Sequence, residues 1–129
     1  MLQKQILNTE NAPAAIGPYN QAVKAGGTLY VSGQIPLIPE TMELVDTGVA
    51  DETHQVLRNV QAILEHAGYT LDDVVKASIF IADMADFATI NEVYSQYFKQ
   101  NQPARECVAV KTLPKNVNVE ISVIAWKAE

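Results

Sequence analysis

The C-terminal segment 117–127 carries the pattern that most restricts the fold. From residue 117 to residue 126 the odd-numbered residues are all apolar, whereas the even-numbered residues mix polar and apolar types. The odd row is Val117, Val119, Ile121, Val123 and Ala125, and the even row is Asn118, Glu120, Ser122, Ile124 and Trp126. A period of two predicts a β-strand with one face in a core. The sheet that contains this strand therefore has one apolar face and one mixed face.

Two stretches with a helical period are available to cover the apolar face. Between Ala50 and Ala67 the apolar residues recur on one helix face, and Gly68 follows as a helix-ending residue. A second apolar stripe runs from Phe87 to Lys99, after Asp86, which we expect to cap that helix. Two helices can cover only one face of a sheet. The mixed face is then left without a cover from its own chain.

Short extended segments account for the rest of the regular structure. Besides the last one, the predicted strands are Lys4–Leu7, Asn20–Ala25, Thr28–Ser32, Val74–Ile81 and Glu106–Lys111, with a short extended piece at Met42–Val45. Gly26-Gly27 predicts a tight hairpin, Thr9–Pro18 an ordered loop, and Pro114–Asn116 a turn. The order predicts an α+β fold. We expect a single two-layer domain over residues 1–129, with a mostly antiparallel mixed sheet and two helices on one face.

The mixed face has a composition that suits neither open water nor a dry core. Lys76, Ser78 and Phe80 of the predicted strand 74–81 add to the even row of the last strand. A wet subunit interface is the best match to such a surface. The sequence therefore predicts an oligomer.

Composition excludes several classes of partner. Nine Lys and Arg against fifteen Asp and Glu give a net charge of −6, which disfavours nucleic acid. No apolar run approaches the roughly 20 residues that span a bilayer, so no membrane is expected. The single cysteine, Cys107, allows no disulfide within the chain, and no export signal is apparent. We expect a cytoplasmic protein.

Metal and nucleotide chemistry lack their usual residues. The only histidines, His54 and His66, are twelve residues apart on one predicted helix. At a rise of 1.5 Å per residue they are separated by roughly 18 Å, too far to share an ion. The glycine-rich phosphate loops and the nucleophile elbow are also missing from the sequence. We therefore expect neither a metal nor a cofactor.

Arg105 is the most distinctive polar residue that remains. It lies where a loop passes into a predicted strand, a position that can hold a guanidinium for two parallel bonds to a carboxylate. An ordinary salt bridge, or a side chain that snorkels along the surface, is the alternative role for such an arginine. Position alone favours this alternative.

Five groups of residues, in the same order along nearly the whole chain, closely resemble the reactive intermediate deaminase (Rid) family, in its YjgF-like RidA subgroup. They are Glu10–Pro13 with Ile16–Tyr19, Ser32–Pro36, Phe87–Asn91, Pro103–Arg105 with Cys107–Val108, and Leu113–Lys115 with Val119–Ile121. The resemblance implies a chorismate mutase-like homotrimer with helices outside and sheets meeting in the middle. It also implies hydrolysis of 2-enamines and 2-imines, such as 2-aminoacrylate and 2-aminocrotonate, to 2-keto acids and ammonia.

The resemblance further implies roles for seven residues. Arg105 would bind the substrate carboxylate, and Glu120 would orient or deprotonate the attacking water. The main chain of Cys107 would help to hold the imine end. The residues expected to line the pocket or lie near it are Tyr19, Ser32, Gly33 and Asn91. We expect the sites to lie between subunits, with Arg105 and Glu120 from one subunit and Tyr19 or Ser32 from the next.

Several of these roles have structural alternatives. Glu120 is either a catalytic base or half of an interface ion pair with a residue such as Lys76. Cys107 has no histidine close in sequence, so its thiol is expected to behave as a small buried hydrophobe. Glu106 departs from the family, which generally has a small residue there. Strand alternation predicts that Glu106 points away from the face that bears Arg105 and Cys107.

Other functions for the same pocket stay open. A noncatalytic module that binds 2-keto acids or amino acids needs the arginine alone, so the presence of Glu120 favours the enzyme. A ribonuclease activity has been attached to relatives of this family. The acidic net charge and the lack of a histidine pair argue against it.

Overall fold

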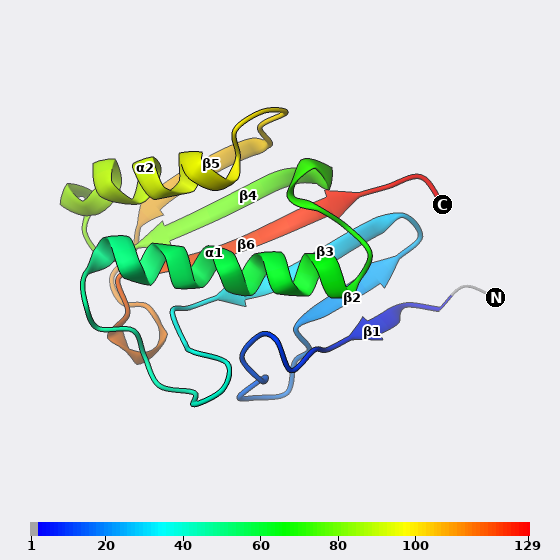
Figure 1. Cartoon of the computed structure of the whole chain (residues 1–129), viewed down its shortest axis with the longest axis horizontal. Coiled ribbons are helices and arrows are strands. Elements are labelled where there is room, and N and C mark those ends of the chain that lie inside the picture. The colour runs from blue at the N-terminus through cyan, green and yellow to red at the C-terminus, as the bar shows by residue number, and fades with distance from the viewer. Residues whose placement is uncertain (1–2) are drawn as a thin grey trace.

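A six-stranded sheet forms one layer of the molecule, and two helices form the other (Figure 1). The computed structural model describes residues 3–129. The strands are β1 (Gln5–Leu7), β2 (Ala22–Ala25), β3 (Thr28–Gln34), β4 (Val74–Ile81), β5 (Ala104–Ala109) and β6 (Val119–Trp126). The helices are α1 (Val49–His66) and α2 (Phe87–Tyr97). This arrangement confirms the predicted α+β class.

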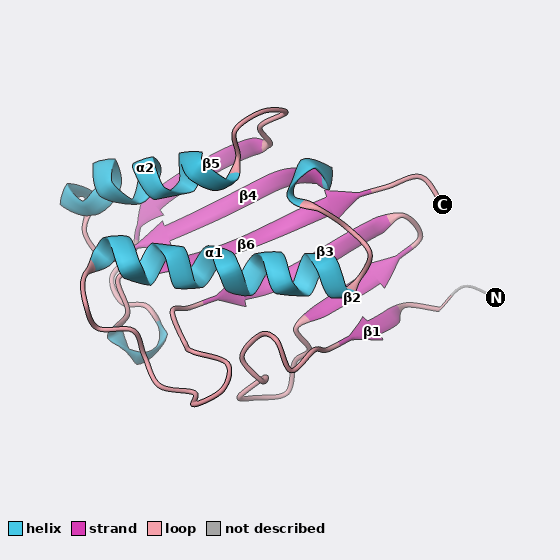
Figure 2. Ribbon diagram, in the orientation of Figure 1, coloured by secondary structure: helices cyan, strands magenta, loops and turns pink. Residues whose placement is uncertain are grey.

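The strand order β1-β2-β3-β6-β4-β5 places the C-terminal strand inside the sheet, between β3 and β4 (Figure 2). Every neighbouring pair is antiparallel except β4 and β5, which run parallel. Parallel strands need a long crossover connection, and α2 supplies it. The sheet is therefore mixed and mostly antiparallel, as predicted.

The odd row of β6 forms the floor of the hydrophobic core. Val119, Ile121 and Ala125 are completely buried. They lie in one cluster with the apolar face of α1, which contributes Val56, Leu57, Val60, Ile63 and Leu64. Both helices cover this same face of the sheet (Figure 1). The alternation in the sequence thus correctly predicted which face is buried.

The helix ends agree with the sequence at α1 and differ at α2. Gly68 adopts a φ of +85° just after α1, as its predicted helix-ending role requires. Asp86 directly precedes α2, as predicted, but it already has helical dihedrals and its side chain accepts no capping bond. Residues Met84–Asp86 form a 3₁₀ turn, and Asp83 caps that turn by accepting from the Ala85 N–H at 2.9 Å. The cap therefore lies one turn earlier than expected.

The predicted hairpin between β2 and β3 depends on its two glycines for different reasons. Gly26 adopts a φ of +60°, a conformation that favours glycine. Gly27 lies so close to the backbone of Lys127 that a Cβ there would collide with the Lys127 carbonyl oxygen. The extended piece expected at Met42–Val45 is reduced to one bridge between Leu37 and Leu44.

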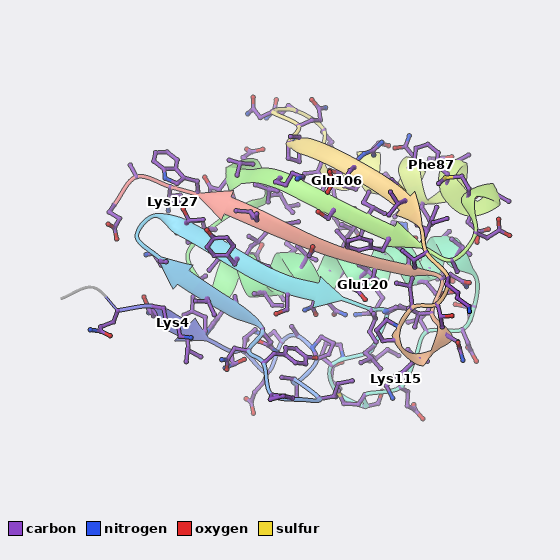
Figure 3. The ribbon with its side chains drawn as sticks, turned by 180° about the vertical axis from the view of Figure 1, so that it is seen from behind. Lys4, Phe87, Glu106, Lys115, Glu120 and Lys127 are labelled. Carbon is purple, nitrogen blue, oxygen red and sulfur yellow. The ribbon has the colours of Figure 1, made fainter. Side chains whose placement is uncertain are left out.

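The second face of the sheet is uncovered in the single chain. Large side chains lie exposed on it, including Tyr30 at 51% and Trp126 at 55% of their full accessible area. Ile6 on β1 and Val108 on β5 are also exposed. Figure 3 views the molecule from this side, with Glu106 and Glu120 on the strands. Within residues 3–129, no helix is long and apolar enough to cross a bilayer.

Candidate functional site

A cavity of about 410 Å³ opens where β3 ends, beside the start of β6. Loop residues form much of its wall. Its lining comes from the loop before β2, the end of β3 with the segment after it, and the turn before β6. The lining residues are Pro13, Ala14, Ile16, Tyr19, Gln21, Ser32, Gly33, Gln34, Ile35, Leu37, Pro114 and Glu120. Four of the predicted site residues, Tyr19, Ser32, Gly33 and Glu120, are thus brought together in one chain.

A β-bulge shapes the strand at this cavity. Val31 pairs with Val123, but the next pair joins Gln34 to Ile121, so β3 carries one extra residue against β6. The irregular stretch is Ser32-Gly33, and bulges of this kind often stand next to functional sites. Gly33 is packed against the Glu120 carboxylate so closely that a Cβ at residue 33 would collide with it. The glycine therefore makes the space in which the Glu120 carboxylate lies.

Glu120 lies partly buried on the uncovered face of the sheet (Figure 3). Burial raises the pKa of its carboxyl above the ordinary value of 4.5. The predicted alternative of an ion pair with Lys76 finds no support within the chain. Lys76 instead lies 3.6 Å from a carboxylate oxygen of Glu106. Glu106 therefore points to the uncovered face, as strand alternation predicted.

Hydrogen bonds fix the loop that carries Tyr19. The Gln21 side chain, which is 2% exposed, makes four hydrogen bonds to the backbone of Thr9, Ala12 and Pro13. The Ser32 hydroxyl donates to the carbonyl of Asn20 at 2.6 Å. The Tyr19 ring is 46% exposed, and its hydroxyl accepts a hydrogen bond from the backbone N–H of Ile16 at 3.3 Å. The loop before β2 is thus held by side chains as well as by the sheet.

Arg105 lies elsewhere, on edge strand β5 next to α2. Its Nη1 donates to Oδ1 of Asn91 at 2.7 Å. The guanidinium carbon lies 4.9 Å from the ring centre of Tyr94 and 5.7 Å from that of Phe87. The ordinary salt bridge is wrong for the single chain: within residues 3–129, Arg105 makes no ion pair, since Lys76–Glu106 is the only one there. Its positive charge is held by neutral groups and stays uncompensated.

Cys107 lies two residues further along β5, on the same side as Arg105. It is partly buried and packs against the main core. Burial raises the pKa of its thiol, although the nearby Arg105 opposes this shift. The thiol therefore stays protonated at neutral pH, in agreement with its predicted role as a small hydrophobe. Across residues 3–129, no three His, Cys, Asp or Glu side chains gather as a metal site would require.

The predicted site residues thus fall into two groups on opposite faces of the sheet. Arg105 pairs in register with Ala77, which is buried beneath the helices. Glu120 is opposite Phe80, and its neighbour Ile121 is the one that faces the helices. Their places on opposite faces of one chain argue against our expectation that one subunit supplies Arg105 and Glu120 together to a site. Glu120 instead shares its cavity with Tyr19, Ser32 and Gly33 of the same chain.

Sequence reasoning missed some residues that shape these groups. Phe87 and Tyr94 belong to the apolar stripe of α2, which was interpreted as core packing alone. Asn91, which was among the predicted site residues, lies on the same helix face, four residues after Phe87. A polar residue inside an apolar stripe was the signal that this face of the helix also contacts a polar group. Gln21 gave no signal, because its partners are backbone groups of a loop whose path no local pattern predicts.

Comparison with known proteins identifies the family. The family model described as endoribonuclease L-PSP, also known as the YjgF/Rid family, matches residues 9–127. The chain belongs to this family. The predicted resemblance to Rid proteins is therefore confirmed.

Individual relatives cover almost the whole chain. A RutC family protein of Pyrococcus horikoshii is 53% identical over 124 residues, which are 96% of this chain and 98% of that protein. The human 2-iminobutanoate/2-iminopropanoate deaminase is 47% identical, over 96% of this chain and 90% of its own. The crystal structure of Escherichia coli TdcF with bound serine superposes with a TM-score of 0.92 at 46% identity, covering 96% of this chain and 99% of that one.

Proposed function

We propose that this protein is a cytoplasmic 2-enamine/2-imine deaminase that works as a homotrimer. Its substrates would be imines such as those from 2-aminoacrylate and 2-aminocrotonate, and its products 2-keto acids and ammonia. The observation that carries this proposal is the pair of uncompensated charged groups, Arg105 among neutral side chains and Glu120 in the cavity. The name of the human relative, a 2-iminobutanoate/2-iminopropanoate deaminase, supports the same activity.

Arg105 is suited to the carboxylate that every such imine carries. A planar guanidinium can make two parallel hydrogen bonds to a carboxylate. Asn91 occupies Nη1 as a neutral acceptor and leaves the positive charge available. The bound carboxylate would fix the adjacent imine carbon in place, and such positioning supplies much of the rate for an already electrophilic group.

Glu120 would move the protons of the reaction. Water adds to the carbon of the protonated imine while Glu120 accepts one proton of the water, which gives a neutral carbinolamine. The protonated carboxyl then returns that proton to the nitrogen. The C–N bond breaks, ammonia leaves, and the Glu120 carboxylate accepts the hydroxyl proton as the C=O forms. Burial brings the pKa of Glu120 nearer to neutral pH, which favours a group that must first accept and then donate a proton.

A homotrimer with sites between subunits would bring the two groups together. Arg105 and Glu120 lie on opposite faces within a chain, so one substrate molecule needs them from two chains. The uncovered sheet face, with Tyr30 and Trp126 exposed, supports such an assembly. A closed ring with threefold symmetry would form three equivalent sites. Light scattering that gives one chain per particle would contradict the trimer.

The activity is tested by a coupled assay. A pyridoxal-phosphate dehydratase acting on serine generates 2-aminoacrylate, and the release of pyruvate is timed with and without this protein. We expect faster keto-acid release with the wild type and release at the buffer rate with Glu120→Gln. Equal rates with and without the wild type would favour a noncatalytic binding module, for which the serine bound to TdcF provides a precedent.

The endoribonuclease named by the family model is the remaining candidate. It is disfavoured by the net charge of −6. The chain also lacks a histidine pair for such chemistry. His54 instead contacts Tyr97, with 2.9 Å between its Nδ1 and the Tyr97 hydroxyl oxygen. Incubation with a radiolabelled single-stranded RNA checks this activity. Cleavage that Arg105→Ala and Glu120→Gln both leave unchanged would separate it from the deaminase site.

A further inference from the structure

The guanidinium of Arg105 lies on a face of α2 formed by three side chains. Phe87, Asn91 and Tyr94 are spaced four and three residues apart, so they share one side of the helix. Asn91 accepts a hydrogen bond from Nη1, and the two rings lie within 6 Å of the guanidinium carbon. Each of these contacts is with a neutral group. Together they restrict the direction of the guanidinium without neutralising its charge.

Arg105 needs such support because of where it stands. β5 is the last strand of the sheet order, so it is paired along one side alone within the chain. The Arg105 side chain is exposed, and an exposed arginine has many rotamers to lose when it binds a ligand. A contact that holds one rotamer in advance lowers this entropic cost of binding.

The ring of Tyr94 is a rigid support. Tyr94 is 5% exposed and stacks on Phe98 with 4.5 Å between ring centres and 25° between ring planes. Its hydroxyl is buried without a hydrogen-bond partner in the described part of the chain. A buried, unpaired hydroxyl lowers stability. The ring face, rather than the hydroxyl, is therefore the part of Tyr94 that acts on Arg105.

We propose that Phe87, Asn91 and Tyr94 are positioning residues, which hold the Arg105 guanidinium in the orientation that binds the substrate carboxylate. Tyr94 contributes most, because its ring is the nearer of the two and the more deeply buried. This inference rests on the proposed function, since it assigns these side chains to the carboxylate-binding half of the same site.

The first test measures binding of 2-oxobutanoate by calorimetry. Tyr94→Leu removes the ring and is expected to weaken binding about 3- to 10-fold, the range of a cation–π contact. Tyr94→Phe keeps the ring and is expected to bind within about twofold of the wild type. Tyr97→Leu is the matched control, because Tyr97 lies on the same helix but contacts His54. If Tyr94→Leu and Tyr97→Leu bind equally well, the proposal is wrong.

A double-mutant cycle separates positioning from a general structural effect. In an Arg105→Ala background, Tyr94→Leu is expected to cause no further loss of binding or of kcat/KM. An equal loss in both backgrounds would contradict the proposal. Should Tyr94→Leu fail to fold, Phe87→Leu at the less buried ring serves in the same cycle, with a smaller expected loss.

An observation without ligand distinguishes failure of this inference from failure of the proposed function. NMR of ¹⁵N-arginine-labelled protein reports how fast the Arg105 guanidinium rotates. We expect slow rotation in the wild type and in Tyr94→Phe, and faster rotation in Tyr94→Leu. Slow rotation in a protein that neither binds 2-oxobutanoate nor hydrolyses imines would refute the function and keep the positioning contact. Unchanged rotation in Tyr94→Leu would refute the positioning.

Discussion

The two halves of the candidate site are built in different ways. Glu120 lies on β6, which has a hydrogen-bonded strand on each side, and its surroundings are loops and a β-bulge. Arg105 lies on an edge strand, and its surroundings are side chains of one helix. The sheet therefore fixes the backbone of Glu120, the proposed acid–base residue, whereas neighbouring side chains fix the Arg105 guanidinium. Changes in the two halves should accordingly have different consequences.

Glu120→Gln is expected to have the largest effect. It removes the proton acceptor and keeps the shape, so kcat should fall by about 100- to 1,000-fold. Binding of 2-oxobutanoate should stay within about threefold of the wild type, because Arg105 is intact. Steady-state kinetics and calorimetry on the same preparation check both statements. A large loss of binding would mean that the two halves are not separable.

Arg105→Lys should weaken ligand binding as well as turnover, in contrast to Glu120→Gln. The ammonium keeps the charge but loses the planar pair of donors, at a cost of about 2 to 3 kcal/mol, or roughly 30- to 150-fold in kcat/KM. Binding of 2-oxobutanoate should weaken in parallel, and the free energy of unfolding should change by less than about 1 kcal/mol. Thermal unfolding measured beside the kinetics provides the control. Turnover near that of the wild type would refute the carboxylate-binding role.

Mixed trimers test whether the halves come from different subunits. An Arg105→Ala chain and a Glu120→Gln chain are each expected to retain about 1% of the wild-type activity or less as homotrimers. In an equal random mixture, about one site in four would join an intact Arg105 to an intact Glu120, so activity should return to about a quarter of the wild type. Mixed assemblies that stay inactive would show that one subunit must supply both residues.

The decrease of kcat/KM at acidic pH should come from the titration of Glu120, in the cavity. Because burial raises the pKa of Glu120 above 4.5, kcat/KM should fall about tenfold per pH unit below that raised pKa. The folded chain holds this proton more tightly than the unfolded chain does. The stability that the protonated group contributes is therefore complete below pH 4.5 and is lost as pH rises through the raised pKa. The stability of Glu120→Gln should not decrease in this pH range, whereas the stability of Arg105→Lys should decrease as in the wild type.

Cys107→Ala should have the smallest effect. The raised pKa keeps the thiol protonated, so its removal is expected to lower kcat by less than about threefold. The main-chain groups of residue 107 remain in place in this variant. A loss above about 100-fold in a folded trimer would instead assign chemistry to the sulfur.

The sequence predicted the fold better than it predicted the grouping of site residues. The alternation in β6 and the stripes of α1 and α2 depend on local spacing, which is why the buried face could be read from the chain. The sharing of one cavity by Glu120, Ser32 and Gly33 depends on β6 pairing with β3, a long-range contact that no local period reveals. The cap at Asp83 was missed because a 3₁₀ turn precedes α2.

The resemblance to Rid proteins supplied the site residues, but not their distribution between faces. That distribution follows from the register, in which Arg105 stands beside Ala77 and Glu120 beside Phe80. The even position of Glu120 already placed it on the mixed face. The face of Arg105 could not be assigned until the strand start at Ala104 and its parallel partner β4 were known.

The buried side chain of Gln21 has a consequence for the association of subunits in the proposed trimer. Its four hydrogen bonds anchor the loop before β2 within its own chain. This loop, which carries Tyr19, therefore has its conformation before a second subunit binds. Docking then joins preorganised surfaces and avoids the entropy loss of ordering a loop on contact. In a Gln21→Leu chain that cost would be transferred to the association step. The concentration of protein at which subunits separate would then rise, even where the isolated fold survives.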